Sequence, residues 1–135
     1  MKQTPKIWGS TCKLFDKNNV EVHRIQVIKG RFCSKHWHRY KHNRFYVESG
    51  ELHIIVWDKG GRATCHCLQD GDVFTVPPRM LHRFEGNQDS VAYEIYWAEL
   101  DADIIRLEPG GINATAQLDA AMKEIGSIMD GKAKI

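Results

Sequence analysis

The sequence predicts an all-β barrel or double-sheet jelly roll followed by one C-terminal α-helix, on three observations. Apolar and polar residues alternate with a period of two through most of the first hundred residues. Turn signals rich in glycine and proline recur between the alternating segments. Beyond residue 110 the apolar spacing becomes that of a helix. We therefore expect a barrel in residues 1–110 and a helix in residues 111–135.

The expected strands are short and closely spaced. Ser49-Gly50 is a hairpin signal between two of them, and Asp70-Gly71 is a further turn. Pro77-Pro78 stops a strand because proline has no N–H to donate to a neighbouring strand. We expect strands at residues 20–28, 45–48, 52–57, 62–68, 73–76, 81–84 and 91–100.

The C-terminal helix carries an apolar stripe on one side. Asn113 or Thr115 is placed to cap its start, and Gly131 to cap its end. The stripe predicts a helix that packs on the barrel or one that forms a dimer contact, and both alternatives stay open. Its residues are Leu118, Ala121, Met122, Ile125, Ile128 and Met129.

Composition excludes several function classes. The chain has 135 residues, 19 of them basic and 17 acidic, and a net charge of +2, which argues against a dedicated nucleic-acid binder. No apolar run approaches the ~20 residues of a membrane span. The first ten residues lack the apolar core of a secretion signal, so we expect a cytoplasmic location with no membrane partner.

Four cysteines are expected to be reduced rather than bridged in a cytoplasmic protein. Cys65-His66-Cys67 holds two of them in a pattern that can attract a soft metal. On a strand, however, the two cysteines share one face while His66 points to the other. Half-buried strand cysteines are therefore favoured over a thiolate site.

Two spaced motifs contain the candidate metal ligands. His36 and His38 lie two residues apart on one face of an extended segment, and His82 follows Pro77-Pro78 downstream. The motifs are Gly30-x5-His36-x-His38-x4-Asn43-x6-Gly50 and Gly71-x5-Pro77-x4-His82.

This pair of motifs resembles the two-part signature of the cupin superfamily. The resemblance implies a double-stranded β-helix in which two histidines and a glutamate from the first motif meet one histidine from the second around a metal. Here Asn43 stands at the glutamate position, with His42 beside it as the alternative. The expected ligands are thus His36, His38, Asn43 and His82. Such a set suits a divalent transition ion such as zinc, iron, nickel, cobalt, copper or manganese.

A narrower resemblance covers residues 8–106. The order of Trp8-Gly9, residues 21–27, residues 77–85 and residues 98–106 is similar to the C-terminal cupin domain of type II mannose-6-phosphate isomerases. It implies aldose–ketose isomerisation of a phosphorylated sugar, in which a metal polarises the carbonyl. His36 and Asn43 depart from that family's glutamine and glutamate. Another metal-dependent cupin enzyme, such as a dioxygenase or lyase, and a non-catalytic sugar-binding cupin therefore remain alternatives.

The isomerase interpretation needs an anion site and a base. Arg79 replaces a glycine usual in the second motif and is the candidate to bind the substrate's phosphate. The general base stays unassigned, with Glu94, Tyr96, His53 and Lys35 as candidates. Because open sheet edges invite pairing, we also expect a homodimer.

Overall fold

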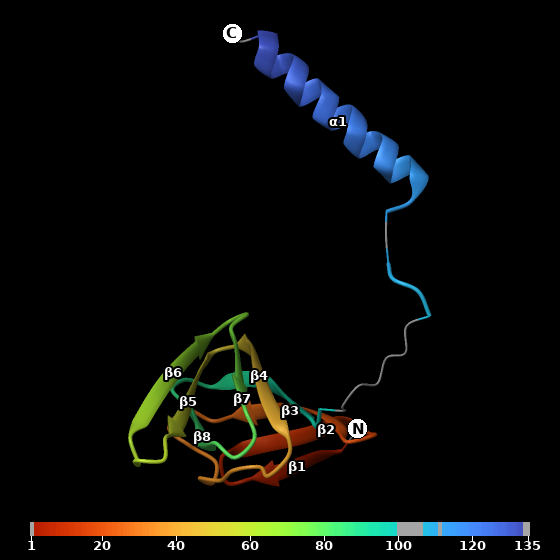
Figure 1. The fold of residues 1–135 in the computed structure, drawn as a ribbon. Coiled ribbons are helices and arrows are strands. Elements are labelled where there is room, and N and C mark those ends of the chain that lie inside the picture. Colours follow the sequence, from red (N-terminus) through yellow and green to blue (C-terminus); the bar gives the residue numbers. More distant parts are fainter. Residues whose placement is uncertain (1, 100–106, 111, 134–135) are drawn as a thin grey trace. The chain divides into compact units, whose positions relative to one another are not determined.

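The computed structural model describes residues 2–99, 107–110 and 112–133, and divides the chain into two compact units, Met1–Leu100 and Asp101–Ile135. The first unit holds the strands, and the second holds the helix α1 (Ala114–Ala133) (Figure 1). The strands are β1 (Gln3–Lys6), β2 (Gly9–Lys17), β3 (Val20–Val27), β4 (His42–Ser49), β5 (Glu51–Trp57), β6 (Ala63–Gln69), β7 (Val73–Val76), β8 (Leu81–Gly86) and β9 (Ser90–Trp97).

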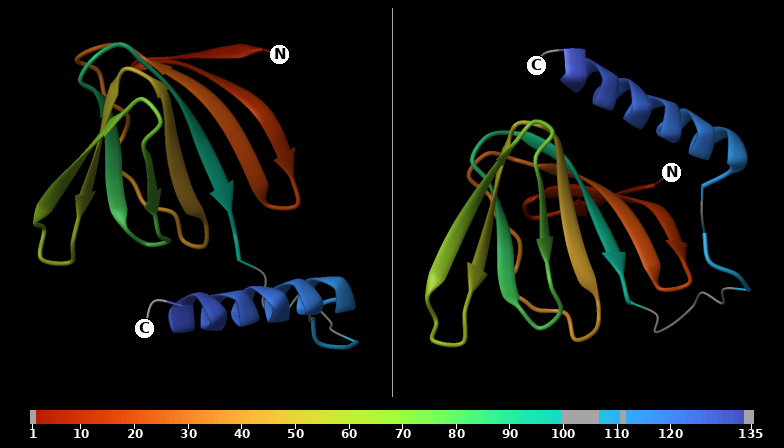
Figure 2. Two further views of the ribbon diagram at one scale, coloured as in Figure 1. Left: turned by 90° about the horizontal axis from the view of Figure 1, so that it is seen from above. Right: turned by 45° about the horizontal axis from the view of Figure 1, so that its top comes forward.

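The strands form two antiparallel sheets that face each other (Figures 1 and 2). The larger sheet has the order β1-β2-β3-β9-β4-β7, and the smaller one β6-β5-β8. This arrangement confirms the predicted all-β fold with a C-terminal helix. Among the described residues, no helix combines the length and apolarity needed to cross a bilayer.

The core lies between the two sheets because alternate residues of each strand point inward. In β5, Leu52, Ile54 and Val56 are buried while their neighbours are partly exposed. Phe45 from β4 and Phe84 from β8 meet them from either side, each burial contributing about 1.5–3 kcal/mol.

An irregular segment before β4 pairs with β8 and extends the smaller sheet. Cys33 N donates to Phe84 O at 3.1 Å, and a further antiparallel bridge joins His36 to His82. In that bridge His36 N donates to His82 O at 3.0 Å, and His82 N donates to His36 O at 2.8 Å. These backbone bonds fix the two candidate metal-binding motifs side by side.

Ser49-Gly50 does not form the predicted hairpin. β4 and β5 belong to different sheets, and Gly50 marks the point where the chain passes from one sheet to the other. Gly50 has a φ of +100°, and a Cβ there would lie 2.4 Å from Asp89 O and 2.8 Å from Ser90 Cα. A turn of this conformation against a neighbouring backbone requires glycine.

Other expectations from the sequence need correction. The strands β1 and β2 were not predicted, because their exposed faces carry no alternation as strong as that of later strands. Cys65 and Cys67 are exposed rather than half-buried. Helix α1 continues through Gly131, so this residue is no C-cap, whereas Asn113 does cap the start, its Oδ1 accepting from Ala116 N at 2.9 Å.

Three further expectations have different outcomes. Residues 100–106 lie outside the described residues, and so does the end of the last predicted strand, at residue 100. The side chain of Met129, predicted to belong to the apolar stripe, is not described either. The predicted division at residue 110 stays a prediction. The exposed side chains of Leu118, Met122 and Ile125 agree with an apolar stripe, while its packing partner stays a prediction.

The crossing at Gly50 predicts an unequal response to alanine. Gly61 also has a positive φ, of +81°, but nothing lies within 4 Å of its Cβ position. Gly61→Ala should therefore lower the free energy of unfolding by only the cost of a left-handed backbone at alanine, about 1–2 kcal/mol. Gly50→Ala adds a clash with fixed backbone and should cost at least about 3 kcal/mol. Urea unfolding of both variants measures the difference, and equal losses would contradict this account of the crossing.

Candidate metal site

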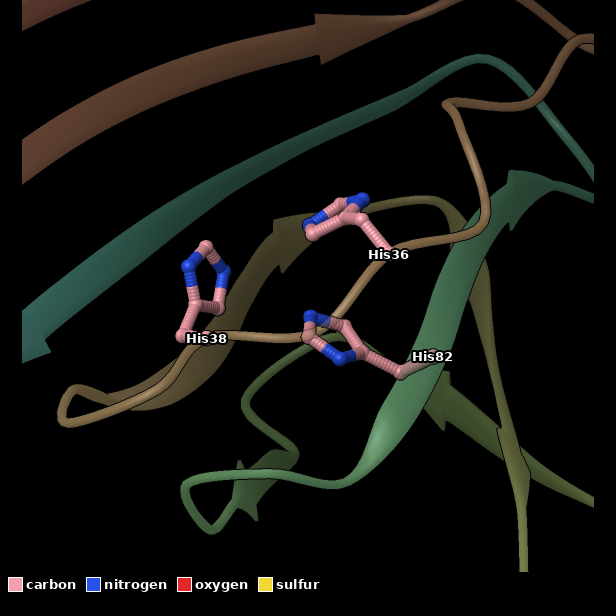
Figure 3. Close-up of side chains that lie close together, drawn as sticks. All are labelled: His36, His38 and His82. Atoms are coloured by element: carbon pink, nitrogen blue, oxygen red, sulfur yellow. The ribbon is translucent and has the colours of Figure 1, made fainter.

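Three histidine side chains converge between the two sheets (Figure 3). His36 and His38 come from the segment before β4, and His82 comes from β8. One nitrogen from each ring lies within 4.8 Å of those of the other two. Metal–imidazole bonds are ~2.0–2.1 Å long, so one ion between the rings would draw these nitrogens to within about 4 Å of one another.

Backbone carbonyls orient two of these rings. His36 Nδ1 lies 2.8 Å from Ser34 O, and His82 Nδ1 lies 2.8 Å from Met80 O. A carbonyl only accepts, so each Nδ1 donates its proton there, and in the neutral form of the ring the lone pair is then on Nε2. Neutral imidazoles held in this way are in the state that binds metal.

Electrostatics also keep the site neutral. The pKa of His82 is lowered to about 4, mainly by burial; the hydrogen bond to Met80 opposes this shift, and nearby His36 and His38 add to it. The pKa of His38 is lowered as well, again mainly by burial. Deprotonated rings at neutral pH leave the lone pairs available.

Buried polar atoms without partners indicate that something is to be bound here. His38 Nε2, His82 Nε2 and Asn43 Oδ1 are buried and have no hydrogen-bond partner among the described residues. Such orphaned atoms are rare because each costs about 1–3 kcal/mol. Imidazole nitrogens and an amide oxygen are a donor set that fits a divalent transition ion.

Asn43, and not His42, faces the barrel interior. Asn43 is 1% exposed, whereas His42 stacks on Trp97 with ring centroids 5.0 Å apart and approaches Glu99 at 3.5 Å. Strand alternation therefore directs the two neighbours as expected. Ligation by Asn43 stays a prediction.

A buried acid lies next to Asn43. Glu94 Oε2 accepts hydrogen bonds from Asn43 Nδ2 at 3.3 Å and from the Tyr96 hydroxyl. Burial raises the pKa of Glu94, and the two hydrogen bonds oppose this shift. The Tyr96 ring in turn contacts His38, with centroids 5.2 Å apart. Glu94 thus connects to His38 through Tyr96.

Two pockets reach the histidines. A small one of about 240 Å³ contains His36, Glu94 and Tyr96, along with Cys33. Burial raises the pKa of Cys33 to about 12, so this thiol stays protonated and is no thiolate ligand. A larger pocket of about 720 Å³ borders His38 and is lined by Trp37, Arg39, Tyr40 and Lys41, among others.

Arg79 lies in a third, adjoining pocket of about 290 Å³ with Trp37 and Arg39. None of the three histidines is among the described residues that line it. Arg79 nevertheless holds a left-handed backbone, with a φ of +67°, and its N–H donates to His38 O at 2.6 Å. A non-glycine residue in this region is strained by about 1–2 kcal/mol.

Sequence reasoning did not separate the base candidates and missed one residue. Glu94 and Tyr96 lie in the pocket of His36, whereas His53 lies beside Glu51 and Lys35 covers Trp57. Arg39 was not singled out, although it borders both the pocket of His38 and that of Arg79. Its position directly after His38 in the sequence could have indicated that it lies near the site.

We predict that metal content depends on His82. His82→Gln removes a buried donor and should lower the bound metal by about one ion per chain relative to the unaltered protein. His66→Gln is the matched control, because that ring stacks on Phe74 with centroids 4.0 Å apart. Elemental analysis after equilibrium dialysis gives the difference. Equal metal in all three proteins would refute the assignment.

A second prediction concerns Asn43. Asn43→Glu replaces a neutral donor by a carboxylate and should tighten metal binding. Without metal, the new carboxylate meets Glu94 and should destabilise the fold. The metal-induced rise in melting temperature should therefore be larger in the variant than in the unaltered protein. A smaller rise would place residue 43 away from the ion.

Comparisons with solved structures show the same fold elsewhere. KdgF from Halomonas sp. is 15% identical with a TM-score of 0.63, over 77% of this chain and 92% of that one. The capsular polysaccharide assembling protein CapF from Staphylococcus aureus is 19% identical with a TM-score of 0.64, over 76% and 32%. Oxalate decarboxylase from Bacillus subtilis, described with Mn(II) centres, is 15% identical with a TM-score of 0.65, over 78% and 30%.

The present chain thus spans about a third of CapF and of oxalate decarboxylase. No curated protein sequence matches it. The family model described as Cupin domain matches residues 23–99, which include both histidine motifs. The chain belongs to the cupin family.

Proposed function

We propose that this cupin is a metal-dependent isomerase of a phosphorylated sugar, of the mannose-6-phosphate isomerase type. One observation supports it most: three histidines converge beside a buried carboxyl group, Glu94, that shares a pocket with His36. Isomerisation between an aldose and a ketose needs a Lewis acid and a group that moves a proton between adjacent carbons.

The chain's residues would divide these tasks. His36, His38 and His82, with the Asn43 amide oxygen, would hold a divalent ion. A bound ion would polarise the sugar carbonyl. The Asn43 side chain would serve twice, since its Nδ2 also positions Glu94.

Glu94 is our candidate for the proton-transfer group. It is 6% exposed, it shares its pocket with His36, and its hydrogen bonds to Tyr96 and Asn43 fix its orientation. His53 and Lys35 lack that proximity. A carboxyl group kept from solvent can exchange a proton with substrate rather than with water.

The pocket beside His38 suits an anionic substrate. Its volume of about 720 Å³ lies in the usual range for small-molecule sites, and it is lined by two basic residues, Arg39 and Lys41, and one acidic residue, Glu99. Lys41 is paired with Glu21 at 3.1 Å. Arg39 also lines the pocket of Arg79, and we propose that these two arginines bind the substrate's phosphate.

The strained backbone supports a functional Arg79. Glycine would take this conformation without strain, yet arginine occupies it. We infer that its side chain compensates for this strain by binding the substrate.

A homodimer and a cytoplasmic location also stay predictions.

Arg79→Gly should separate stability from binding. The variant relieves backbone strain, so the free energy of unfolding should stay equal or rise by up to about 1 kcal/mol. Loss of a charge-assisted contact, worth about 1.5–3 kcal/mol, should weaken mannose 6-phosphate binding roughly ten- to a hundredfold. Unphosphorylated mannose should be affected far less.

Calorimetry on both ligands measures this effect. Arg62→Ala, in the turn between β5 and β6, is the control for a general loss of positive charge and should bind like the unaltered protein. An equal loss for both sugars, or no binding of mannose 6-phosphate by the unaltered protein, would contradict the phosphate site.

Glu94→Gln tests the reaction itself. The amide keeps the shape but cannot transfer the proton, so turnover should fall about 10²–10⁴-fold while metal content is unchanged. The assay follows conversion of mannose 6-phosphate to fructose 6-phosphate. Metal-loaded protein that binds the sugar phosphate without converting it to fructose 6-phosphate would instead be a non-catalytic binding cupin.

A further inference from the structure

A second group of metal-binding side chains lies on the outer face of the smaller sheet. His53 from β5 lies directly across from Cys67 on β6, and Cys65 lies two residues away on the same strand. One donor atom from each lies within 4.8 Å of the other two. Both thiols are exposed, so an ion can reach them.

This group is separate from the interior histidines. In β5, Leu52, Ile54 and Val56 face the core, so His53 between them points to the opposite side. His82 on β8 pairs with Val56 and is buried with it. The three outer donors therefore cannot bind the same ion as His36, His38 and His82.

A carboxylate holds the outer imidazole. Glu51 Oε2 lies 3.4 Å from His53 Nε2, and Glu51 in turn accepts hydrogen bonds from Gln69 and Asn87. A carboxylate bonded to one nitrogen of a histidine is the usual way to present the other nitrogen to a metal. The pairing is thus more than three donors in chance proximity.

A disulfide is a poorer explanation of the two thiols. Residues i and i+2 of one strand have Cα atoms about 6.6–6.8 Å apart, at the upper limit for a bridge. An ion bonded to both sulfurs needs no such approach. Two thiolates and one imidazole select a thiophilic ion such as zinc over manganese or magnesium.

We propose that His53, Cys65 and Cys67 form a second metal site that binds zinc, with its fourth position open to solvent. The register between β5 and β6 brings His53 close to the two cysteines. His66, which lies between the cysteines in the sequence, is not a ligand because its ring stacks on Phe74 on the other face. The site is independent of the proposed isomerase activity.

Cobalt(II) titration of the reduced protein tests this site directly. Cobalt bound to thiolate gives an intense near-ultraviolet charge-transfer band, which an ion held by imidazole and amide alone does not give. The unaltered protein should develop the band in full by about two cobalt ions per chain, because the interior histidines can take up one ion without giving the band. Two equivalents of zinc, enough for both sites, should abolish it.

Variants assign the ligands. Cys65→Ser with Cys67→Ser should lose the band, and His53→Gln should weaken cobalt binding about tenfold or more, since loss of a mere orienting partner already costs that much. His66→Gln and His82→Gln should keep the band unchanged. Circular dichroism confirms that each variant is folded.

Three results would overturn the proposal. The first is no band in the reduced, unaltered protein. The second is a band that survives the double cysteine substitution, because another thiol would then be the ligand. The third is a band that depends on His66 or His82 but not on His53.

Discussion

The two-way backbone bridge between His36 and His82 is the interaction on which the candidate metal site depends. These residues lie 46 positions apart in the sequence, yet each donates its N–H to the other's carbonyl, at 3.0 and 2.8 Å. The bridge ends a run of pairing in which Cys33 N also donates to Phe84 O. Together with the bond from Arg79 N to His38 O, this pairing holds the first motif beside the second.

From this bridge the interior chemistry follows. Strand alternation directs His36, His38 and His82 into one space, and carbonyls of Ser34 and Met80 set two of the rings. Burial lowers the pKa of His82 and of His38, which favours their neutral, metal-binding form. The same enclosure surrounds Glu94, so a metal-binding set and a proton-transfer group share one interior.

The sequence was informative where spacing alone determines position. The two motifs predicted that His36, His38 and His82 lie close together, and the structure places them so. Asn43 was placed inward by the same alternation, and the structure agrees. The Asn113 cap could also be predicted, since it depends only on neighbouring residues.

Prediction failed where pairing between distant strands decides the outcome. Ser49-Gly50 has the composition of a hairpin, but which sheet each strand joins depends on the β4–β9 and β5–β8 pairs. Glu94 could not be separated from three other candidates for the same reason. Cys65 and Cys67 gained His53 as a neighbour through the register of β5 against β6, which no local pattern of the sequence encodes.

The central claim is that one ion binds between the histidines of the two motifs. Anomalous diffraction from crystals grown with a single divalent metal, recorded on both sides of that metal's absorption edge, tests it most directly. The account predicts one anomalous peak about 2.0–2.2 Å from a nitrogen of each of His36, His38 and His82. A fully reduced, metal-saturated crystal with no peak in that space would contradict it, whatever is bound elsewhere on the molecule.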